Sequence, residues 1–287
     1  MRRIWLVVAI MVAVGACSPS KPAQQAQPTP SVSVPTATPT SSTVRFAAVG
    51  DIGDGSNRPA LVANAILAGH RERPLDLILL LGDIIYPDGD VAEIAKFREP
   101  YAPLIAEDLE MHVALGNHDI QTDRDAFMDA FDMPARWYTF VRGPVQFFAL
   151  DSSRGVIEGA QRSWLDRALA RSRARWKVVF MHVPMFSSGI HGNNLALQQA
   201  LQPLFDRYDV SLALAGHDHN YERTQPILGT VYVVSGGGCC PRSTGSQSFT
   251  ARALTGLHFV VVEAGEDALH IEAFDPEGKS LDRVTLT

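Results

Sequence analysis

The feature that most constrains this chain is a repeated pattern in which a short apolar run stops at a polar residue. Five runs end in this way, and four of them place a glycine directly before the polar side chain. The polar ends are Asp51, Asp83, Asn117, His182 and His217. A glycine at that point permits a tight turn and a close backbone approach. The pattern predicts buried strands whose carboxyl ends share one edge, where open α/β sheets bind their ligands.

The hydrophobic periodicity predicts an α/β fold. Short runs rich in β-branched residues indicate buried strands at residues 44–50, 75–81, 111–115, 176–181 and 210–215. Helical spacing lies between them at residues 59–68, 91–106, 161–173 and 194–208, with Asn57 and Asn193 as candidate N-caps. A second group of strands is expected at residues 138–141, 145–150, 230–235, 257–263, 268–274 and 280–287. This alternation predicts helices layered on a largely parallel sheet.

The first 43 residues have the pattern of an export and anchoring segment. Arg2 and Arg3 precede an apolar run at residues 4–16, which is shorter than the roughly 20 residues that cross a bilayer. Residues 1–16 are therefore expected to be a signal peptide. The small residues before Cys17 resemble a bacterial lipobox, which implies a lipidated Cys17 and an exported protein anchored to the membrane of the cell envelope, on its periplasmic or cell-surface face. Ordinary secretion is the alternative.

Residues 17–43 are rich in proline, serine and threonine and contain no aromatic residue. Such a segment buries too little apolar surface to offset the entropy of ordering it, so a disordered tether is expected. The folded domain is then predicted to span residues 44–287.

Charge and cysteine content limit the partners. A formal charge of −6 argues against specific nucleic-acid binding, which relies on clustered Lys and Arg. The three cysteines are Cys17, Cys239 and Cys240, too few for a cysteine-based zinc site. The adjacent Cys239 and Cys240 fit a vicinal disulfide, two free thiols or the rim of a pocket, and a structural or incidental role is favoured.

The donors at the strand ends predict a joint metal site. Each one alone has a simpler explanation, such as a helix cap, a turn or a hydrogen-bonded core histidine, but capping does not require oxygen or imidazole donors at five successive strand ends. A donor set without thiolate suits iron, manganese or zinc. Seven donors are more than one four-coordinate ion can bind, and they fit two ions that share a carboxylate. Paired metals of this kind recur in enzymes that catalyse in-line displacement at phosphorus. The expected ligands are Asp51, Asp83, Tyr86, Asn117, His182, His217 and His219.

In their order, these motifs resemble those of the calcineurin-like metallophosphoesterases. They read GDIG at 50–53, GDIIY at 82–86, GNHD at 116–119, VFMH at 179–182 and GHDH at 216–219. Tyr86 is similar to the tyrosine of the purple acid phosphatase branch, and residues 161–165, 216–220 and 278–281 resemble its small mammalian, tartrate-resistant type. The resemblance implies a four-layer α/β/β/α sandwich with the site at one edge of its two sheets.

The resemblance also implies which metals bind. Ferric iron is expected at Asp51, Asp83, Tyr86 and His219, and Fe(II), zinc or manganese at Asp83, Asn117, His182 and His217, with Asp83 as the bridge. The implied function is hydrolysis of small phosphate monoesters by direct attack of a metal-bound hydroxide, as in acid phosphatases, without a covalent phosphoenzyme.

Three further residues are candidates for catalysis. His118 follows a predicted ligand, so its ring is expected at the mouth of the site as the acid that protonates the leaving group, with Asp119 orienting it. His191 resembles the family's second substrate-contacting histidine. The remaining histidines, His70, His112, His258 and His270, are expected to be structural.

Three other functions remain open at this point. A phosphodiesterase or nucleotidase of the same superfamily is the first alternative, and a non-catalytic, surface-binding lipoprotein is the second. A redox or peroxidative role for the iron is the third.

Overall fold

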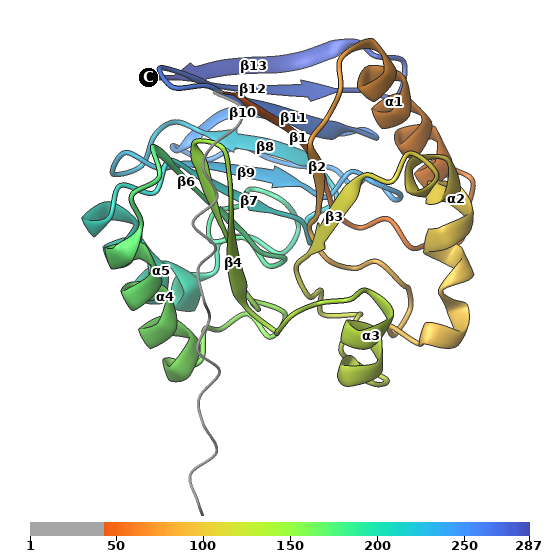
Figure 1. The fold of residues 1–287 in the computed structure, drawn as a ribbon, viewed down its shortest axis with the longest axis horizontal. Helices are drawn as coiled ribbons and strands as arrows, with labels where there is room; N and C mark the ends of the chain where they lie inside the picture. The colour runs from red at the N-terminus through yellow and green to blue at the C-terminus, as the bar shows by residue number, and fades with distance from the viewer. Residues whose placement is uncertain (1–42) are drawn as a thin grey trace, which may run out of the picture. The chain divides into compact units, whose positions relative to one another are not determined.

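Two mixed β-sheets, each covered on its outer face by helices, build the fold (Figure 1). The computed structural model describes residues 43–287. The first sheet has the order β13-β12-β11-β1-β2-β3 and the second has the order β10-β8-β9-β7-β6-β5-β4. The four-layer α/β/β/α arrangement is confirmed. The largely parallel pairing expected from the alternation is found only in the core of each sheet, because antiparallel strands extend both cores.

The strand bounds follow the predicted runs closely. The first sheet contains β1 (Val44–Val49), β2 (Leu77–Leu80), β3 (Glu110–Val113), β11 (Phe259–Ala264), β12 (Leu269–Phe274) and β13 (Ser280–Leu286). The second contains β4 (Tyr138–Arg142), β5 (Val145–Ala149), β6 (Trp176–Phe180), β7 (Leu212–Ala215), β8 (Tyr221–Thr224), β9 (Val231–Ser235) and β10 (Thr250–Leu254). Strands β8 and β10 were not predicted, because polar residues interrupt their apolar pattern.

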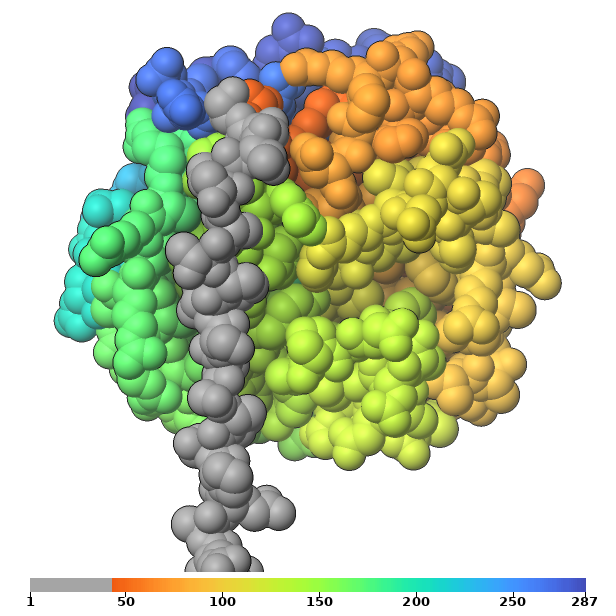
Figure 2. Space-filling view, in the orientation of Figure 1, coloured from red at the N-terminus to blue at the C-terminus, as the bar shows by residue number. Residues whose placement is uncertain are grey.

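Helices cover the outer faces of both sheets. The first sheet carries α1 (Arg58–Glu72), the short 3-10 helix η1 (Val91–Glu93), α2 (Ala95–Ile105) and α3 (Arg124–Ala130), and the second carries α4 (Gly159–Arg171) and α5 (Leu195–Arg207). In the space-filling view, the atoms of α2 and α3, coloured yellow and yellow-green, lie at the surface of the face shown (Figure 2). Helix α3 was not predicted, since its seven residues are too few for a clear helical period.

Period-two alternation sorts the side chains of β1 between two cores. Phe46 and Ala48 point into the layer between the sheets, whereas Ala47 and Val49 point toward the helices. The same alternation repeats along the neighbouring strands, so a continuous apolar layer joins the two sheets. This layer fixes how the loops at the strand ends meet.

The carboxyl ends of the parallel strands meet at one edge. Strands β1, β2 and β3 are parallel, as are β5, β6, β7 and β9. The Gly50 N–H donates to the Ser235 carbonyl at 2.9 Å, and the Gly238 N–H donates to the Gly50 carbonyl at 3.1 Å. These backbone bonds join β1 of the first sheet to β9 of the second, beside the predicted ligands.

The helix caps differ in part from the prediction. Asn194, not Asn193, caps α5 by accepting from the Leu197 N–H at 3.0 Å. Asn193 instead accepts from the Ser187 N–H at 3.1 Å. The N-cap position, from which a side chain can reach the N–H groups of the first helical turn, is occupied by the next residue, Asn194. Asn57 stands at the N-cap of α1 but makes no capping hydrogen bond.

The signal peptide, the Cys17 lipid anchor and nearly all of the tether lie outside the described residues. No helix within residues 43–287 has both the length and the apolar character needed to cross a bilayer.

Candidate metal centre

The first group of donor atoms comes from the loops after β1, β2 and β7. The Tyr86 hydroxyl donates to Asp51 Oδ1 at 3.0 Å and lies 3.2 Å from His219 Nε2. His219 Nε2 is itself 3.3 Å from Asp51 Oδ1. The Nδ1–H of His219 donates to the Cys240 carbonyl at 2.9 Å, which leaves Nε2 to face the other two donors. Carboxylate, phenol and imidazole therefore converge on one point.

The second group combines the loop after β3 with the ends of β6 and β7. His182 Nε2 lies 3.0 Å from Asn117 Oδ1 and 3.2 Å from His217 Nδ1. The Nδ1–H of the fully buried His182 donates to the Leu81 carbonyl at 2.8 Å, so that Nε2 is again the nitrogen that faces the site. An amide oxygen and two imidazoles thus form a second convergent set.

Asp83 connects the two groups. Its Oδ1 lies 3.4 Å from His182 Nε2 of the second group, and its carboxylate also interacts with the Tyr86 hydroxyl of the first. Asp51, Asp83 and His182 offer ligand atoms that all lie within 4.8 Å of one another. The structure thus brings all seven predicted ligands together, in the two sets expected.

The spacing of these atoms fits metal coordination. Oxygen and nitrogen ligands bound about 2.0–2.2 Å from one ion stand about 3 Å apart when their bonds meet near right angles. The separations in each set, from 3.0 to 3.3 Å, have this size. The donor chemistry and its geometry therefore suit two cations, and metal binding itself stays a prediction.

Three of the predicted ligands have a left-handed backbone conformation. Asp51, Asp83 and His217 have φ values of 60°, 53° and 70°. For residues other than glycine this region costs about 1–3 kcal/mol each, and such strain concentrates at functional sites. This backbone conformation directs the three side chains from the strand ends into the site. The sequence pattern does not predict the conformation.

Two glycines allow the loops to approach one another. A Cβ on Gly116 would lie 2.1 Å from the Asp83 nitrogen, and one on Gly82 would lie 2.7 Å from His182 Nδ1. The close backbone approach predicted from the repeated glycine is confirmed at these positions. A larger residue at either would push a predicted ligand out of place.

Asp119 organises the backbone of the predicted metal site. Its buried carboxylate accepts from the N–H groups of Asp83 at 2.9 Å, Ile84 at 2.8 Å and Gly116 at 2.9 Å. Within residues 43–287 no hydrogen bond joins it to the His118 ring, which contacts the Pro87 carbonyl instead, so the expected orienting role has no direct contact behind it and stays a prediction. The buried carboxylate satisfies amides that would otherwise be orphaned.

His118 and His191 lie at the edges of the donor groups. The His118 ring contacts the Pro87 carbonyl through Nδ1, packs against Tyr86 with ring centroids 4.6 Å apart, and is about one-third exposed. The His191 ring stacks on His217 with centroids 4.1 Å apart. Both rings are thus open to solvent beside the predicted metals.

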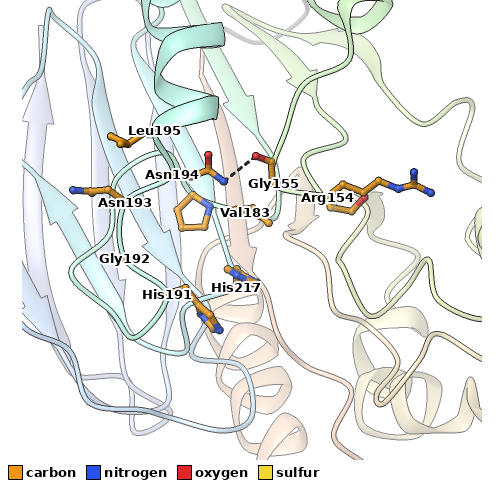
Figure 3. A pocket seen from close by; sticks show the side chains of 11 residues that line it. Arg154, Gly155, Val183, His191, Gly192, Asn193, Asn194, Leu195 and His217 are labelled. Atoms are coloured by element: carbon orange, nitrogen blue, oxygen red, sulfur yellow. Dashed lines mark hydrogen bonds between the residues drawn. The ribbon is translucent and has the colours of Figure 1, made fainter.

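A cavity of about 480 Å³ opens beside the second donor group (Figure 3). Most of its walls come from the loops after β5 and β6, and His191 and His217 lie side by side in its lining. The side-chain amide of Asn194 donates to the Gly155 carbonyl at 2.9 Å and ties the two loops together. The cavity is large enough for a small organic group next to the second donor group.

Charges within the site favour a cation. Burial opposes protonation of His182, but the Asp83 carboxylate outweighs it and raises the pKa of His182 to about 10. Burial also opposes ionisation of Asp83, yet His182 holds the pKa of that carboxyl well below its usual range. Burial and the neighbouring His182 and His191 lower the pKa of His217 to about 3. Without a metal, the site thus stabilises one positive charge, on His182, and disfavours a second one on His217.

For Tyr86 and Asp119, the surroundings oppose the charged form of the side chain. Burial, followed by the charges of Asp51 and Asp83, raises the pKa of the Tyr86 hydroxyl far above its usual range. Burial and the Asp83 charge raise the pKa of Asp119 to about 7. Ionising Tyr86 between two carboxylates therefore requires a compensating positive charge.

The structure shows contacts that the sequence pattern left open or did not predict. Cys239 and Cys240 form a disulfide, one of the alternatives left open, and the Cys240 carbonyl orients His219. Asp218 lies within the GHDH motif and binds the His191 loop, and its place between two predicted ligands was an available signal. The histidines expected to be structural make contacts outside the donor groups; they are His70, His112, His258 and His270.

Comparison with known proteins identifies relatives. The family model described as calcineurin-like phosphoesterase matches residues 44–221. Tartrate-resistant acid phosphatase type 5 of Homo sapiens is 30% identical over 237 residues, which cover 68% of this chain and 73% of that protein. An uncharacterized protein of Mycobacterium tuberculosis is 32% identical over 150 residues, 41% of this chain and 28% of that protein, so this chain spans well under half the length of that relative.

A solved structure supports the fold. The purple acid phosphatase PPD1 from yellow lupin seeds superposes with a TM-score of 0.72 at 22% identity, covering 87% of this chain and 55% of that one. At this identity, the likeness shows the sandwich architecture alone.

Proposed function

The chain belongs to the calcineurin-like phosphoesterase family, and we propose that it is a hydrolase of small phosphate monoesters with a two-metal centre. The observation that carries this proposal is the convergence of seven donors into two sets that share Asp83. Two bound cations would supply an activated water and neutralise charge on the phosphoryl group. Similarity to an acid phosphatase over most of its length supports the phosphomonoester as substrate.

The roles of the surrounding side chains follow from their positions. His118 is partly exposed at the edge of the first group, where its ring can deliver a proton to the departing alkoxide. His191 lies on the other side, above His217, where its ring can hold a phosphoryl oxygen. Asp119 keeps the Asp83 turn rigid through its amide contacts, which preserves the shared ligand.

The test compares two esters. Purified full-length protein is assayed with 4-nitrophenyl phosphate and with bis(4-nitrophenyl) phosphate, beside the Asp83→Asn variant. We expect metal-dependent turnover that favours the monoester and depends on Asp83. A preference for the bis-ester would indicate the phosphodiesterase alternative. Absence of turnover with either ester, in protein that contains two metals, would favour the non-catalytic lipoprotein.

We further propose ferric iron in the first donor group. The Tyr86 hydroxyl lies between Asp51 and His219, and the raised pKa of this phenol means that a strongly positive ion is needed to ionise it. Phenolate bound to ferric iron gives a visible charge-transfer band. Metal analysis and a visible spectrum of wild type and Tyr86→Phe test this: the band should vanish in the variant, and a colourless protein with two zinc or manganese ions would contradict the assignment. Peroxide-dependent oxidation assays test the redox alternative.

Export and lipid anchoring through Cys17 are a separate proposal, based on the sequence of residues 1–17. A bacterial host that expresses the full chain should incorporate labelled fatty acid into it and retain it in the membrane fraction. The Cys17→Ser variant should lose both properties. Labelling that persists in this variant would contradict lipidation at Cys17.

A further inference from the structure

A buried carboxylate lies beneath the loop that carries His191. Asp218 is fully buried, and its Oδ1 accepts from both the backbone N–H of His191 at 3.1 Å and the ring Nδ1 at 2.9 Å. Its Oδ2 accepts from the Ser187 hydroxyl at 2.5 Å. In the sequence, Asp218 lies between His217 and His219, two predicted metal ligands. One residue therefore links the ligand turn to the His191 loop.

We propose that Asp218 is the positioning residue that fixes the His191 ring for substrate binding, an inference that rests on the proposed function. An ionised carboxylate accepts hydrogen bonds and cannot donate them. The proton of the neutral His191 ring therefore lies on Nδ1, and Nε2 is left for the substrate. The His191 side chain is 43% exposed, and besides Asp218 it meets the face of the His217 ring. Among the residues from 43 to 287, Asp218 supplies the hydrogen bond that holds this ring, which lines the pocket (Figure 3).

The loop is shaped around this carboxylate. A Cβ on Gly189 would lie 2.5 Å from Asp218 Cγ, so the chain passes directly against the carboxyl group. The Ser187 hydroxyl that donates to Asp218 also accepts from the Gly189 N–H at 2.9 Å. Residues 187–191 thus place backbone, hydroxyl and imidazole donors on the same carboxylate, which is the pattern of a dedicated anchor.

A double-mutant cycle tests the proposal. In full-length protein, Asp218→Ala should lower kcat/KM for 4-nitrophenyl phosphate by about 10–100-fold, mainly through KM, as loss of an orienting partner does. In the His191→Ala background the same change should have less than about a twofold further effect, since the cycle isolates the coupling. Asp218→Asn should restore much of the loss, because its amide oxygen still accepts from Nδ1–H.

Controls separate positioning from folding and metal loss. Metal content is measured for each variant, and Ser187→Ala, a milder change at the same anchor, should likewise have its effect only when His191 is present. Asp151→Ala removes a buried carboxylate that binds Ser153 and Arg136 instead, and any loss it causes should persist in the His191→Ala background. If the wild type hydrolyses no phosphoester, the proposed function fails. If the wild type is active and the Asp218 and Ser187 losses are independent of His191, only the positioning proposal fails.

A second inference rests on the charge of the same cavity. Among its lining residues Arg154 carries the one permanent charge, and no carboxylate lines it, although the chain as a whole is acidic. Arg154 is exposed and makes no hydrogen bond or ion pair with any residue from 43 to 287. In Figure 3 it lies across the cavity from His191, and its guanidinium points away from both histidines. An anion bound there would be remote from the phosphate under attack.

We infer that Arg154 selects phosphate monoesters whose alcohol part carries a second anionic group. Phenyl phosphate and 4-carboxyphenyl phosphate form a matched pair of probes. In the full-length protein, Arg154→Gln should lower kcat/KM for the carboxylated ester about 2–5-fold more than for phenyl phosphate, as expected for one solvent-exposed ion pair. Arg154→Lys should retain most of the preference. Equal losses for both esters would overturn the inference, and inactivity of the wild type toward both would instead count against the proposed function.

Discussion

The two sheets contribute different chemistry to the predicted metal centre. The loops after β1, β2 and β3 supply the oxygen donors, which are Asp51, Asp83, Tyr86 and Asn117. The loops after β6 and β7 supply the imidazoles, which are His182, His217 and His219. Each donor set takes members from both sheets. Neither sheet alone offers the mixed coordination that either set provides, so the site depends on how the sheets pack.

The largest effect is expected for the carboxylate that both donor sets share. Asp83→Asn should remove metal from both sets and lower kcat/KM by more than about 100-fold, since loss of an outer partner of a ligand already costs about 10–100-fold. Metal content per chain and turnover of 4-nitrophenyl phosphate are the measurements. The exposed Asp206→Asn is the control. An Asp83→Asn protein that retains two metals would contradict the shared role.

The packing between the sheets can be broken at an aromatic pair. Phe46 of the first sheet and Phe147 of the second meet edge to face, with ring centroids 5.0 Å apart. Phe147→Ala should lower the free energy of unfolding by about 3–5 kcal/mol and weaken metal binding as well. Phe205→Ala, which opens the layer between the second sheet and α5, should have a similar cost with a smaller effect on metal affinity. Urea unfolding and metal titration measure both, and equal losses of metal affinity would count against the comparison.

An ion pair between two predicted ligands joins the first sheet to the second. His182 Nε2 lies 3.4 Å from Asp83 Oδ1, and the pKa of His182 is raised from 6.5 to about 10. A raised pKa contributes stability that is fully present below about pH 6.5 and is lost as the pH rises toward 10. In protein stripped by a chelator, the urea midpoint should therefore fall between pH 6.5 and 10, and His182→Gln should flatten this dependence. An unchanged slope in the variant would show that the pair is not responsible.

The smallest effect is expected at the N-termini of two helices, one packed on each sheet. Asn194 caps α5 beside the second sheet, whereas Asn57 at the start of α1 beside the first makes no capping bond. Asn194→Ala should lower the free energy of unfolding by about 1 kcal/mol, and Asn57→Ala by no more than a few tenths. Thermal or urea unfolding measures the difference. Equal costs would mean that the cap geometry does not decide stability at these positions.

The element pattern was largely readable from the sequence, and its failures have local causes. Strand β8 has the sequence Tyr-Glu-Arg-Thr, with only Tyr221 among the hydrophobic residues, and its pairing with β9 holds it in the sheet. Strand β10 pairs with β8 through a register shift, so its alternation is interrupted. Both are antiparallel additions to the second sheet, stabilised by neighbours distant in the sequence rather than by their own pattern.

The candidate site divides in the same way. The identity of the donors was readable because each stands after an apolar run with a glycine beside it, as at Gly82-Asp83 and Gly116-Asn117. The role of Asp119 was not, because its partners are backbone amides brought to it by the fold. The place of Asp218 in the GHDH motif was readable, but its partner was not, since His191 reaches it from a loop 27 residues earlier in the chain.

The sequence by itself determined which side chains stand at the strand ends, the α/β character and the family, because these follow from local hydrophobic pattern and motif order. The family resemblance implied that His219 joins Asp51 and Tyr86 while His182 and His217 join Asn117, but only the tertiary structure brings these side chains to within 3.0–3.3 Å of one another. That pairing depends on the apolar layer between the sheets and on the backbone bonds at Gly50. Hydrophobic packing is non-directional, so the strand pattern favours burial but cannot by itself say which loops meet.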